Sequence, residues 1–474
     1  MGSANISFDN IPASIRKPGK YFEFNTKLAV RTLPGNQQKV LIVGQRLAAG
    51  TVQANTLVDI FSAADANTYF GRGSMLALMV AAAVAANPYL SLQAIAMDDA
   101  GAGVAASGTI TITGPATAAG VLTVQVGDML VQVAIANADT ATVIAAALNA
   151  QFAKQPDLPL SATAAAGVVT VSAKNKGTLG NAIKVSATVT NGIGVTAVAS
   201  ALASGATDPT IATVLATVFA AGHNIIITPW NDTVNLTALR THLDNASGPL
   251  EQRGVIGVYA HVGTVSQATT LAASIDSGRL TGALLPGCYE NVFELAAAYG
   301  AVIASEEDPA RPLNTLALTG ISAPPQASWL DRVSVENCLW NGVTPLTVGP
   351  GNKVQIERAI TTYTLDPQSI PDVSLLDLTT IRTLDYVRKA VRERIALHYP
   401  REKLSEKTAP KVRSDILDVL YKCEELEIVE FVADNSPGVI VERDLQDNNR
   451  LDAKIPCNVV NGLHVFAGRI DLLL

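Results

Sequence analysis

Short apolar strands and amphipathic helices alternate along two separated parts of the chain, and this alternation constrains the fold more than any other feature. The second part opens with a helix signal at residues 208–222, where Asp208 and Pro209 suit the first turn and Gly222 suits the position after the last turn. Further strand and helix patterns follow. Such alternation is typical of a largely parallel sheet covered by helices on both faces. The sequence therefore predicts an α/β core domain.

Residues 101–207 interrupt that pattern and differ in composition. They are rich in Ala, Gly, Thr and Val, contain Phe152 as their one aromatic residue, and lack arginine. Stretches such as "GTITITG" and "GVVTVSAKNKG" alternate strictly and are separated by glycine, as short antiparallel strands do. We expect a self-contained, solvent-exposed β-rich domain here, inserted into a core domain that is split between residues 31–100 and 208–342.

Both ends of the chain carry strand sequences without a nearby partner. Residues 1–30 predict an arm with two prolines followed by a short aromatic strand that includes Tyr21, Phe22 and Phe24. After residue 343 the pattern becomes α+β, and it ends on "LHVFAGRIDLLL". A lone strand must pair with a distant segment or with another chain. We expect an N-terminal arm at residues 1–30 and a C-terminal domain at residues 343–474 that ends in a strand arm.

Composition argues against several classes of protein. The net charge is -7 and the chain has no basic tract, so nucleic acid is not an expected partner. The most hydrophobic window, Met75–Ala86, is shorter than the ~18 apolar residues of a membrane span, so we expect a buried helix and no membrane insertion. The start of the chain lacks the apolar segment of a secretory signal. Four widely spaced cysteines predict reduced, buried thiols.

The sequence shows no pattern typical of a catalytic, cofactor or metal site. Phosphate-loop, dinucleotide, nucleophile-elbow and zinc-helix motifs are all missing. The five histidines have no histidine or cysteine at ligand spacing. Glu306, Glu307 and Asp308 form an acidic cluster before two prolines, which favours a solvated loop. We therefore predict that the chain is not an enzyme and that it has no catalytic residue, cofactor or metal.

One charged residue interrupts a strand-like stretch near the start of the last third of the chain. Residues 352–368 alternate as a strand would, through Val354, Ile356 and a β-branched run up to Tyr363, and the pattern ends at a proline. Arg358 lies in the middle. It either faces solvent at a sheet edge or pairs with an acid on an adjoining helix or on a neighbouring chain.

An ordered series of such stretches resembles contractile phage tail sheath proteins, and in particular the Mu-like group. The C-terminal stretches "ERAITTYTLD" and "DLTTIRTLDYVRKAVRERIALHYPREKL" carry the resemblance most strongly. "IPASIRKPGKYFEFN" is similar to the N-terminal arm of that group, and "LIVGQRLAAGTV" with "FSAADANTYFGRGSMLALM" to the block after it. "DLPLSATAAAGVVTVSAKNKGTLGNAIKV" and "NIIITPWND" look like its inserted domain and the strand that follows.

The resemblance implies a structural protein that assembles from many copies. Such sheaths stack six-fold rings around a tail tube in an extended form, and they contract when the baseplate is triggered, which drives the tube through the host envelope. The implied partners are further copies of the chain, the tail tube protein, and baseplate and tail terminator proteins. The implied location is the virion tail, assembled in the host cytoplasm.

The same resemblance implies that the inserted domain points outward and that residues 343–474 form the inner domain, which lies against the tube and builds the contacts between subunits. It also implies that both chain ends add strands to neighbouring subunits. We therefore expect subunit contacts from nine residues. These are Tyr21, Phe22, Phe24, Arg358, Leu463, Val465, Ile470, Leu472 and Leu474.

Other functions compete with this interpretation. A pyocin-like or secretion-system sheath has the same pattern. A doubly wound enzyme would place its active site after the strand that leads to Pro229, Trp230, Asn231 and Asp232, but it would need a fingerprint that the chain lacks. A surface adhesin would need a signal peptide.

Overall fold

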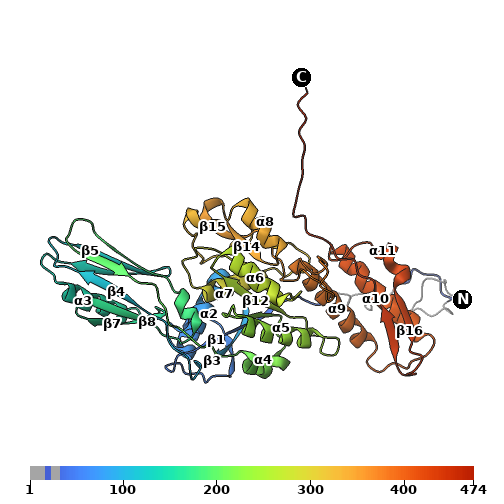
Figure 1. The fold of residues 1–474 in the computed structure, drawn as a ribbon. Helices are drawn as coiled ribbons and strands as arrows, with labels where there is room; N and C mark the ends of the chain where they lie inside the picture. Colours follow the sequence, from blue (N-terminus) through green and yellow to red (C-terminus); the bar gives the residue numbers. More distant parts are fainter. Residues whose placement is uncertain (1–15, 23–32, 474) are drawn as a thin grey trace. The chain divides into compact units, whose positions relative to one another are not determined.

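The computed structural model describes residues 16–22 and 33–473 and divides the chain into two compact units. The larger unit comprises Asn36–Tyr386 together with Cys457–Leu474. The smaller unit contains Val387–Pro456 together with residues 16–22 and 33–35. Each unit is described by itself below, with the elements labelled as in Figure 1.

An eight-stranded sheet forms the centre of the larger unit. Its strands, in the order of the sheet, are β15 (Lys353–Ile356), β14 (Thr344–Gly349), β13 (Leu280–Leu284), β12 (Ile256–His261), β11 (Ile225–Ile227), β1 (Lys39–Gln45), β3 (Ser91–Met97) and β2 (Leu57–Ile60). The six inner strands are parallel, and only the edge strands β15 and β2 run antiparallel to their neighbours. The parallel α/β sheet expected from the sequence is confirmed.

Helices between the strands bury the apolar faces of this sheet. They are α1 (Ala63–Phe70), α2 (Met75–Ala86), α4 (Ala212–Val218), α5 (Thr233–Ser247), α6 (Val265–Ile275), α7 (Val292–Ser305) and α8 (Arg332–Trp340). Helix α2 begins at the N-cap Ser74, whose hydroxyl accepts from the Ala77 amide, and seven of its side chains are buried. It packs against α7, which is buried along most of its length. The predicted core helix at Met75–Ala86 is therefore confirmed.

Residues 101–207 fold around a separate hydrophobic core. One sheet contains β10 (Thr196–Ala199), β4 (Ser107–Thr113), β8 (Val168–Ala173) and β7 (Leu160–Ala165), and the other contains β6 (Met129–Ile135), β5 (Gly120–Val126) and β9 (Val185–Val189). All pairs within the two sheets are antiparallel. Helix α3 (Ala141–Ala153) closes this core with Ile144, Leu148 and Phe152.

The two connections of this inserted domain pair with each other where they leave the large sheet. Val104 and Ala206 form an antiparallel bridge with reciprocal hydrogen bonds of 2.9 and 3.1 Å between their backbone groups. Polar contacts complete the junction. The Asp99 carboxylate accepts from Gln45 Nε2 at 2.7 Å and from the Lys176 amide at 3.1 Å. The insert is thus one module with a closed base.

The smaller unit is α+β. Helix α9 (Leu378–His398) starts in the larger unit and continues into the smaller one, where α10 (Thr408–Glu425), the short α11 (Val432–Asn435) and a two-stranded sheet follow. The sheet is a hairpin of β16 (Ile440–Arg443) and β17 (Leu451–Lys454). Arg394 pairs with Asp418 at 2.6 Å, which ties α9 to α10.

The stretch around Arg358 is not the long strand that its pattern predicts. The strand ends at Ile356, and the chain then leaves the ladder. Thr361 and Thr362 are fully buried, and their amides donate to the carbonyls of Leu376 and Leu280 rather than to one partner strand. The β-branched side chains of Thr361 and Thr362 therefore belong to a buried irregular segment and not to a strand. Because β14 and β15 belong to the large sheet, the boundary that we expected at residue 343 does not coincide with the sheet's edge.

Three of the four cysteines are buried free thiols, and Cys457 is half-buried. Among the described residues, no helix has the length and apolar character needed to cross a membrane.

Removal of the insert should leave a core that still folds. We expect a chain in which residues 105–205 are replaced by Asn-Gly to be soluble and to unfold cooperatively, because the bridge between Val104 and Ala206 already brings the cut ends together and a two-residue turn can join antiparallel partners. Loss of the Lys176 contact to Asp99 should lower the melting temperature by several degrees. Circular dichroism and calorimetry measure both quantities. An aggregated product, or a melt without cooperativity, would show that the core needs the insert.

Stability should also depend on pH through one buried carboxyl group. Burial, reinforced by Asp128 and Glu290, raises the pKa of Glu294 from 4.5 to about 7. A raised carboxyl pKa means that the unfolded chain ionises first, so stability falls between about pH 4.5 and 7 and stays low above that range. Glu294→Gln keeps an oxygen to accept from the Asn291 amide but removes the charge.

We therefore expect Glu294→Gln to be more stable than the native chain at pH 8, by on the order of 2–3 kcal/mol, and nearly equal to it at pH 4.5. Denaturant unfolding at the two pH values measures the difference. Glu307→Gln, on an exposed loop, is the matched control. The same difference at both pH values would rule out ionisation as its cause.

Candidate functional site

Charged side chains hold the beginning of α9 against the core of the larger unit. Asp377 lies directly before the helix and pairs with Arg358, and Asp385 pairs through both its oxygens with Arg279 at 2.7 and 3.0 Å. Between them, the buried Arg382 donates to the backbone carbonyl of Glu306. The first two turns of α9 are thus fixed by contacts to three separate segments of the chain.

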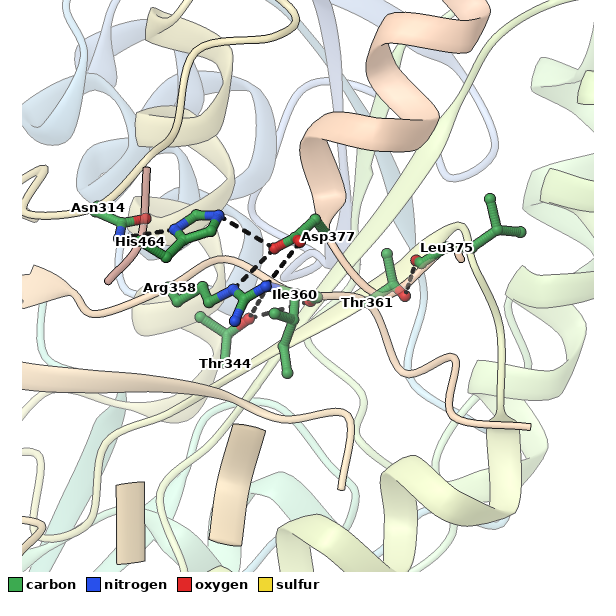
Figure 2. Close-up of polar contacts among 8 residues, drawn as sticks. All are labelled: Asn314, Thr344, Arg358, Ile360, Thr361, Leu375, Asp377 and His464. Carbon is green, nitrogen blue, oxygen red and sulfur yellow. Dashed lines mark hydrogen bonds and ion pairs between the residues drawn. The ribbon is translucent and has the colours of Figure 1, made fainter. Parts of the chain in front are cut away.

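Arg358 forms a bidentate ion pair within its own chain. Its Nε and a terminal nitrogen lie 2.9 and 2.7 Å from the two oxygens of Asp377, as Figure 2 shows. The two side chains are 28% and 23% exposed, so water screens the pair only in part. Of the two alternatives for Arg358, the ion pair with an acid at an adjoining helix is the one observed.

The backbone on both sides of this pair is tied down by threonine hydroxyls. Thr344 on β14 accepts from the Ile360 amide at 3.0 Å and also donates to the Ile360 carbonyl at 3.1 Å. Thr361 donates to the Leu375 carbonyl at 2.7 Å (Figure 2). These bonds hold the segment after Arg358 beside the segment before Asp377, so the backbone that carries both charged side chains is held in place.

The C-terminal segment reaches the same place through His464. Asn314 Nδ2 donates to His464 Nδ1 at 3.1 Å, and His464 Nε2 lies 3.5 Å from an Asp377 oxygen (Figure 2). Burial lowers the pKa of His464, Arg358 lowers it further, and Asp377 partly opposes them. We call Asn314, Arg358, Asp377 and His464 the anchor cluster.

The acidic loop that the sequence indicates has a structural role beside this cluster. Burial lowers the pKa of Arg382 to about 10, while the charges of Glu306 and Asp308 favour its protonated form. Glu306 also lies 3.8 Å from Arg311. The loop is therefore only partly the solvated segment that we expected, because it faces a buried cation.

The other residues predicted as subunit contacts are not brought together within the chain. Tyr21 and Phe22 are 41% and 88% exposed, and neither belongs to a strand. The predicted C-terminal strand has no partner in the described chain, and its apolar side chains are exposed. These are Leu463, Val465, Ile470 and Leu472. Phe24 and Leu474 lie outside the described residues.

Sequence reasoning missed Asp377, Asn314 and His464 as partners of Arg358. His464 was expected to be unremarkable. Its one sequence signal is that it is the only ionisable residue among the first six of "LHVFAGRIDLLL". Strict alternation places its side chain on the face opposite to Leu463 and Val465. Asp377 and Asn314 have no sequence signal that distinguishes them from ordinary helix-start and loop residues.

The residues that a doubly wound enzyme would use have local structural contacts instead. Trp230 is fully buried, and Asp232 caps α5 by accepting from the Asn235 amide at 2.9 Å. Asn231 donates to the Ala260 carbonyl. Within residues 16–22 and 33–473, no group of three or more His, Cys, Asp or Glu side chains is placed to hold a metal ion.

Two family models match most of the chain after the insert. Residues 204–362 match the phage tail sheath protein central domain, and residues 371–472 match the phage tail sheath C-terminal domain. The first match contains Arg358 and Asn314, and the second contains Asp377 and His464. The anchor cluster therefore joins the two matched regions.

Whole-chain similarities point the same way. The Mu-like prophage FluMu tail sheath protein of Haemophilus influenzae is 33% identical over 487 residues, which cover 99% of this chain and 100% of that protein. The crystal structure of a sheath tail protein from Desulfitobacterium hafniense has a TM-score of 0.52 at 12% identity and covers 94% of this chain and 97% of its own. A sheath tail protein from Listeria innocua gives 0.50 at 13% identity, covering 91% and 94%. The chain therefore belongs to the phage tail sheath protein family, in its Mu-like group.

Proposed function

We propose that this chain is the structural subunit of a contractile tail sheath, which polymerises as a helical stack of six-fold rings around a tail tube. Contraction of this polymer drives the tube through the host envelope. The subunit has no enzymatic activity and no cofactor in this proposal. One observation carries it beyond family membership, namely a C-terminal segment whose large apolar side chains are exposed and have no partner strand in the described chain.

The exposure of that segment is costly unless another chain covers it. Phe466, Ile470, Leu472 and Leu473 are each more than 80% exposed, and Ile470 reaches 98%. Burial of one such side chain contributes roughly 1.5–3 kcal/mol. Exposed apolar strand sequences also invite uncontrolled pairing, which proteins avoid by covering them. Pairing with a neighbouring subunit satisfies both requirements.

The hairpin of β16 and β17 is a suitable acceptor for such a strand. It has two strands only, and both outer edges lack a further strand among the described residues. Isolated two-stranded sheets are marginally stable, and additional strands stabilise them. We propose that strands from the termini of neighbouring subunits, including the segment of Tyr21 and Phe22 and residues 465–474, add to this hairpin by main-chain pairing.

Pairing of this kind explains a polymer better than a closed dimer. The donating segment and the accepting hairpin are different surfaces, so the contact is heterologous and can be repeated from subunit to subunit. The linked subunits can then change their packing without separating. We propose that the work of contraction comes from two packings of the same subunit that differ in free energy, with no chemical step in this chain.

Partners and location follow from the same proposal. The polymer contacts the tail tube protein along its length and the baseplate and tail terminator proteins at its two ends. It is assembled in the host cytoplasm and forms part of the virion tail, with no direct contact to nucleic acid. A pyocin-like or secretion-system particle built from the same kind of sheath is the alternative.

Removal of residues 465–474 should abolish polymer formation and leave the fold intact. The exposed side chains of this segment contribute nothing to the core of their own chain, so the truncated protein should melt as the native chain does. Sedimentation measures assembly, and circular dichroism measures folding. Electron microscopy of the native polymer should show tubes or stacked rings.

A matched control keeps the apolar strand and changes only its local charges. Arg469 and Asp471 form an exposed ion pair at 2.6 Å, so the double substitution to alanine should still polymerise. Tubes formed by the truncated chain would refute strand exchange by this segment. Loss of folding on truncation would mean that the segment completes its own subunit.

A further inference from the structure

Burial along the C-terminal segment ends abruptly at His464. Every described residue from 465 to 473 is exposed, whereas the His464 side chain is only 14% exposed. Its neighbours Leu463 and Val465 are 82% and 79% exposed. The imidazole is thus largely withdrawn from water while the aliphatic side chains on both sides are exposed. Hydrophobic burial alone would produce the reverse. Specific contacts must therefore hold the ring.

The contacts of the ring define how it is held. Asn314 donates to Nδ1, so that nitrogen is an acceptor, and the proton of the neutral ring lies on Nε2, which faces Asp377. Arg358 fixes the Asp377 carboxylate from its other side with two hydrogen bonds. The ring therefore sits between an amide and a carboxylate that other segments hold in place.

The backbone is also tightly packed at Gly462, two residues before His464. A Cβ atom on Gly462 would lie 2.6 Å from Cγ of Pro312 and 2.8 Å from Nε2 of His464, distances shorter than van der Waals contact allows. Glycine is thus required for the backbone to pass between this proline and the ring. Pro312 and Asn314 belong to the same loop, so the segment is fitted to that loop at two nearby points.

We propose that His464, with Gly462, pins the C-terminal segment to the core of its own subunit, so that only residues 465–474 are available to pair with another subunit. Pairing of those residues with another subunit rests on the proposed function, whereas the attachment of His464 to its own subunit, called the pin below, does not. His464 acts as a positioning residue. Ten extended residues span at most about 33–36 Å, so a fixed starting point limits which acceptor hairpin the segment can reach.

Trypsin offers a test in which one molecule contains its own reference site. Leu463→Lys, at an exposed position, places a cleavage site next to the pin, while the native site after Arg469 lies in the free segment. In the full-length chain carrying this substitution, we expect cleavage after residue 463 to be at least about tenfold slower than cleavage after Arg469. The reason is that proteolysis requires the segment to detach locally.

Loss of the hydrogen bond between Asn314 and His464 should remove that difference in cleavage rate, and a substitution at Asn314 removes the bond without changing the sequence around the cleavage site. Asn314→Ala, added to Leu463→Lys, should accelerate cleavage after residue 463 by about fivefold to tenfold, the change expected from one lost hydrogen bond of ~1–1.4 kcal/mol. Cleavage after Arg469 should be unchanged. His464→Ala should act likewise, and His464→Asn should partly restore protection because its amide oxygen can accept from Asn314 in place of Nδ1.

The outcomes separate the pin from the proposed strand exchange. Equal cleavage at the two sites before any pin substitution, or no effect of Asn314→Ala and His464→Ala, would overturn the pin. In the assembled polymer, protection should be gained at Arg469. If it is not gained there while residue 463 stays protected in the free subunit, the pin stands and strand exchange fails.

Discussion

The ion pair between Arg358 and Asp377 is the contact on which the anchor cluster and the start of α9 depend. It joins the segment that leaves the large sheet to the residue that precedes α9, and the same carboxylate faces His464. A negative charge directly before a helix is also favoured by the helix dipole. Because both partners are largely withdrawn from water, removal of either one leaves a poorly solvated charge, which costs more than the pair itself contributes.

The beginning of α9 is fixed at more than this one point. Arg279 pairs with Asp385 of the helix, and the helix residue Arg382 donates to the Glu306 carbonyl. These contacts lie within the first two turns, so the start of α9 is part of the packed core of the larger unit.

Much of the fold was predictable because it follows from periodic patterns. The parallel sheet, the buried helix at Met75–Ala86 and the antiparallel strands of the insert all follow from side-chain periodicity and turn residues, which act locally. The strand through Arg358 was predicted too long. Its β-branched residues are buried by contacts to Leu280 and Leu376, and such distant partners leave no periodic trace.

The anchor cluster was predictable only in part, for the same reason. Arg358 was recognisable as a charge in an apolar stretch, and an acid partner was a reasonable expectation. Asp377 and Asn314 could not be named, because their roles arise from where the loops after the strands meet. His464 stood out only by its position, since a single histidine has many ordinary explanations and its burial is a tertiary effect.

The closed base of the inserted domain has a consequence for how sheath proteins of this kind can diverge. The bridge between Val104 and Ala206 brings the two connections of the insert together as in a short hairpin, and loops near this base add contacts to the core, such as the ion pair of Arg72 with Asp157 at 2.6 Å. The entropy of closing a loop grows only slowly with its length, by about 0.6 kcal/mol for each doubling. The part of the insert that makes no contact to the core can therefore change in sequence and size at little thermodynamic penalty to the core, as long as the contacts at the base are kept.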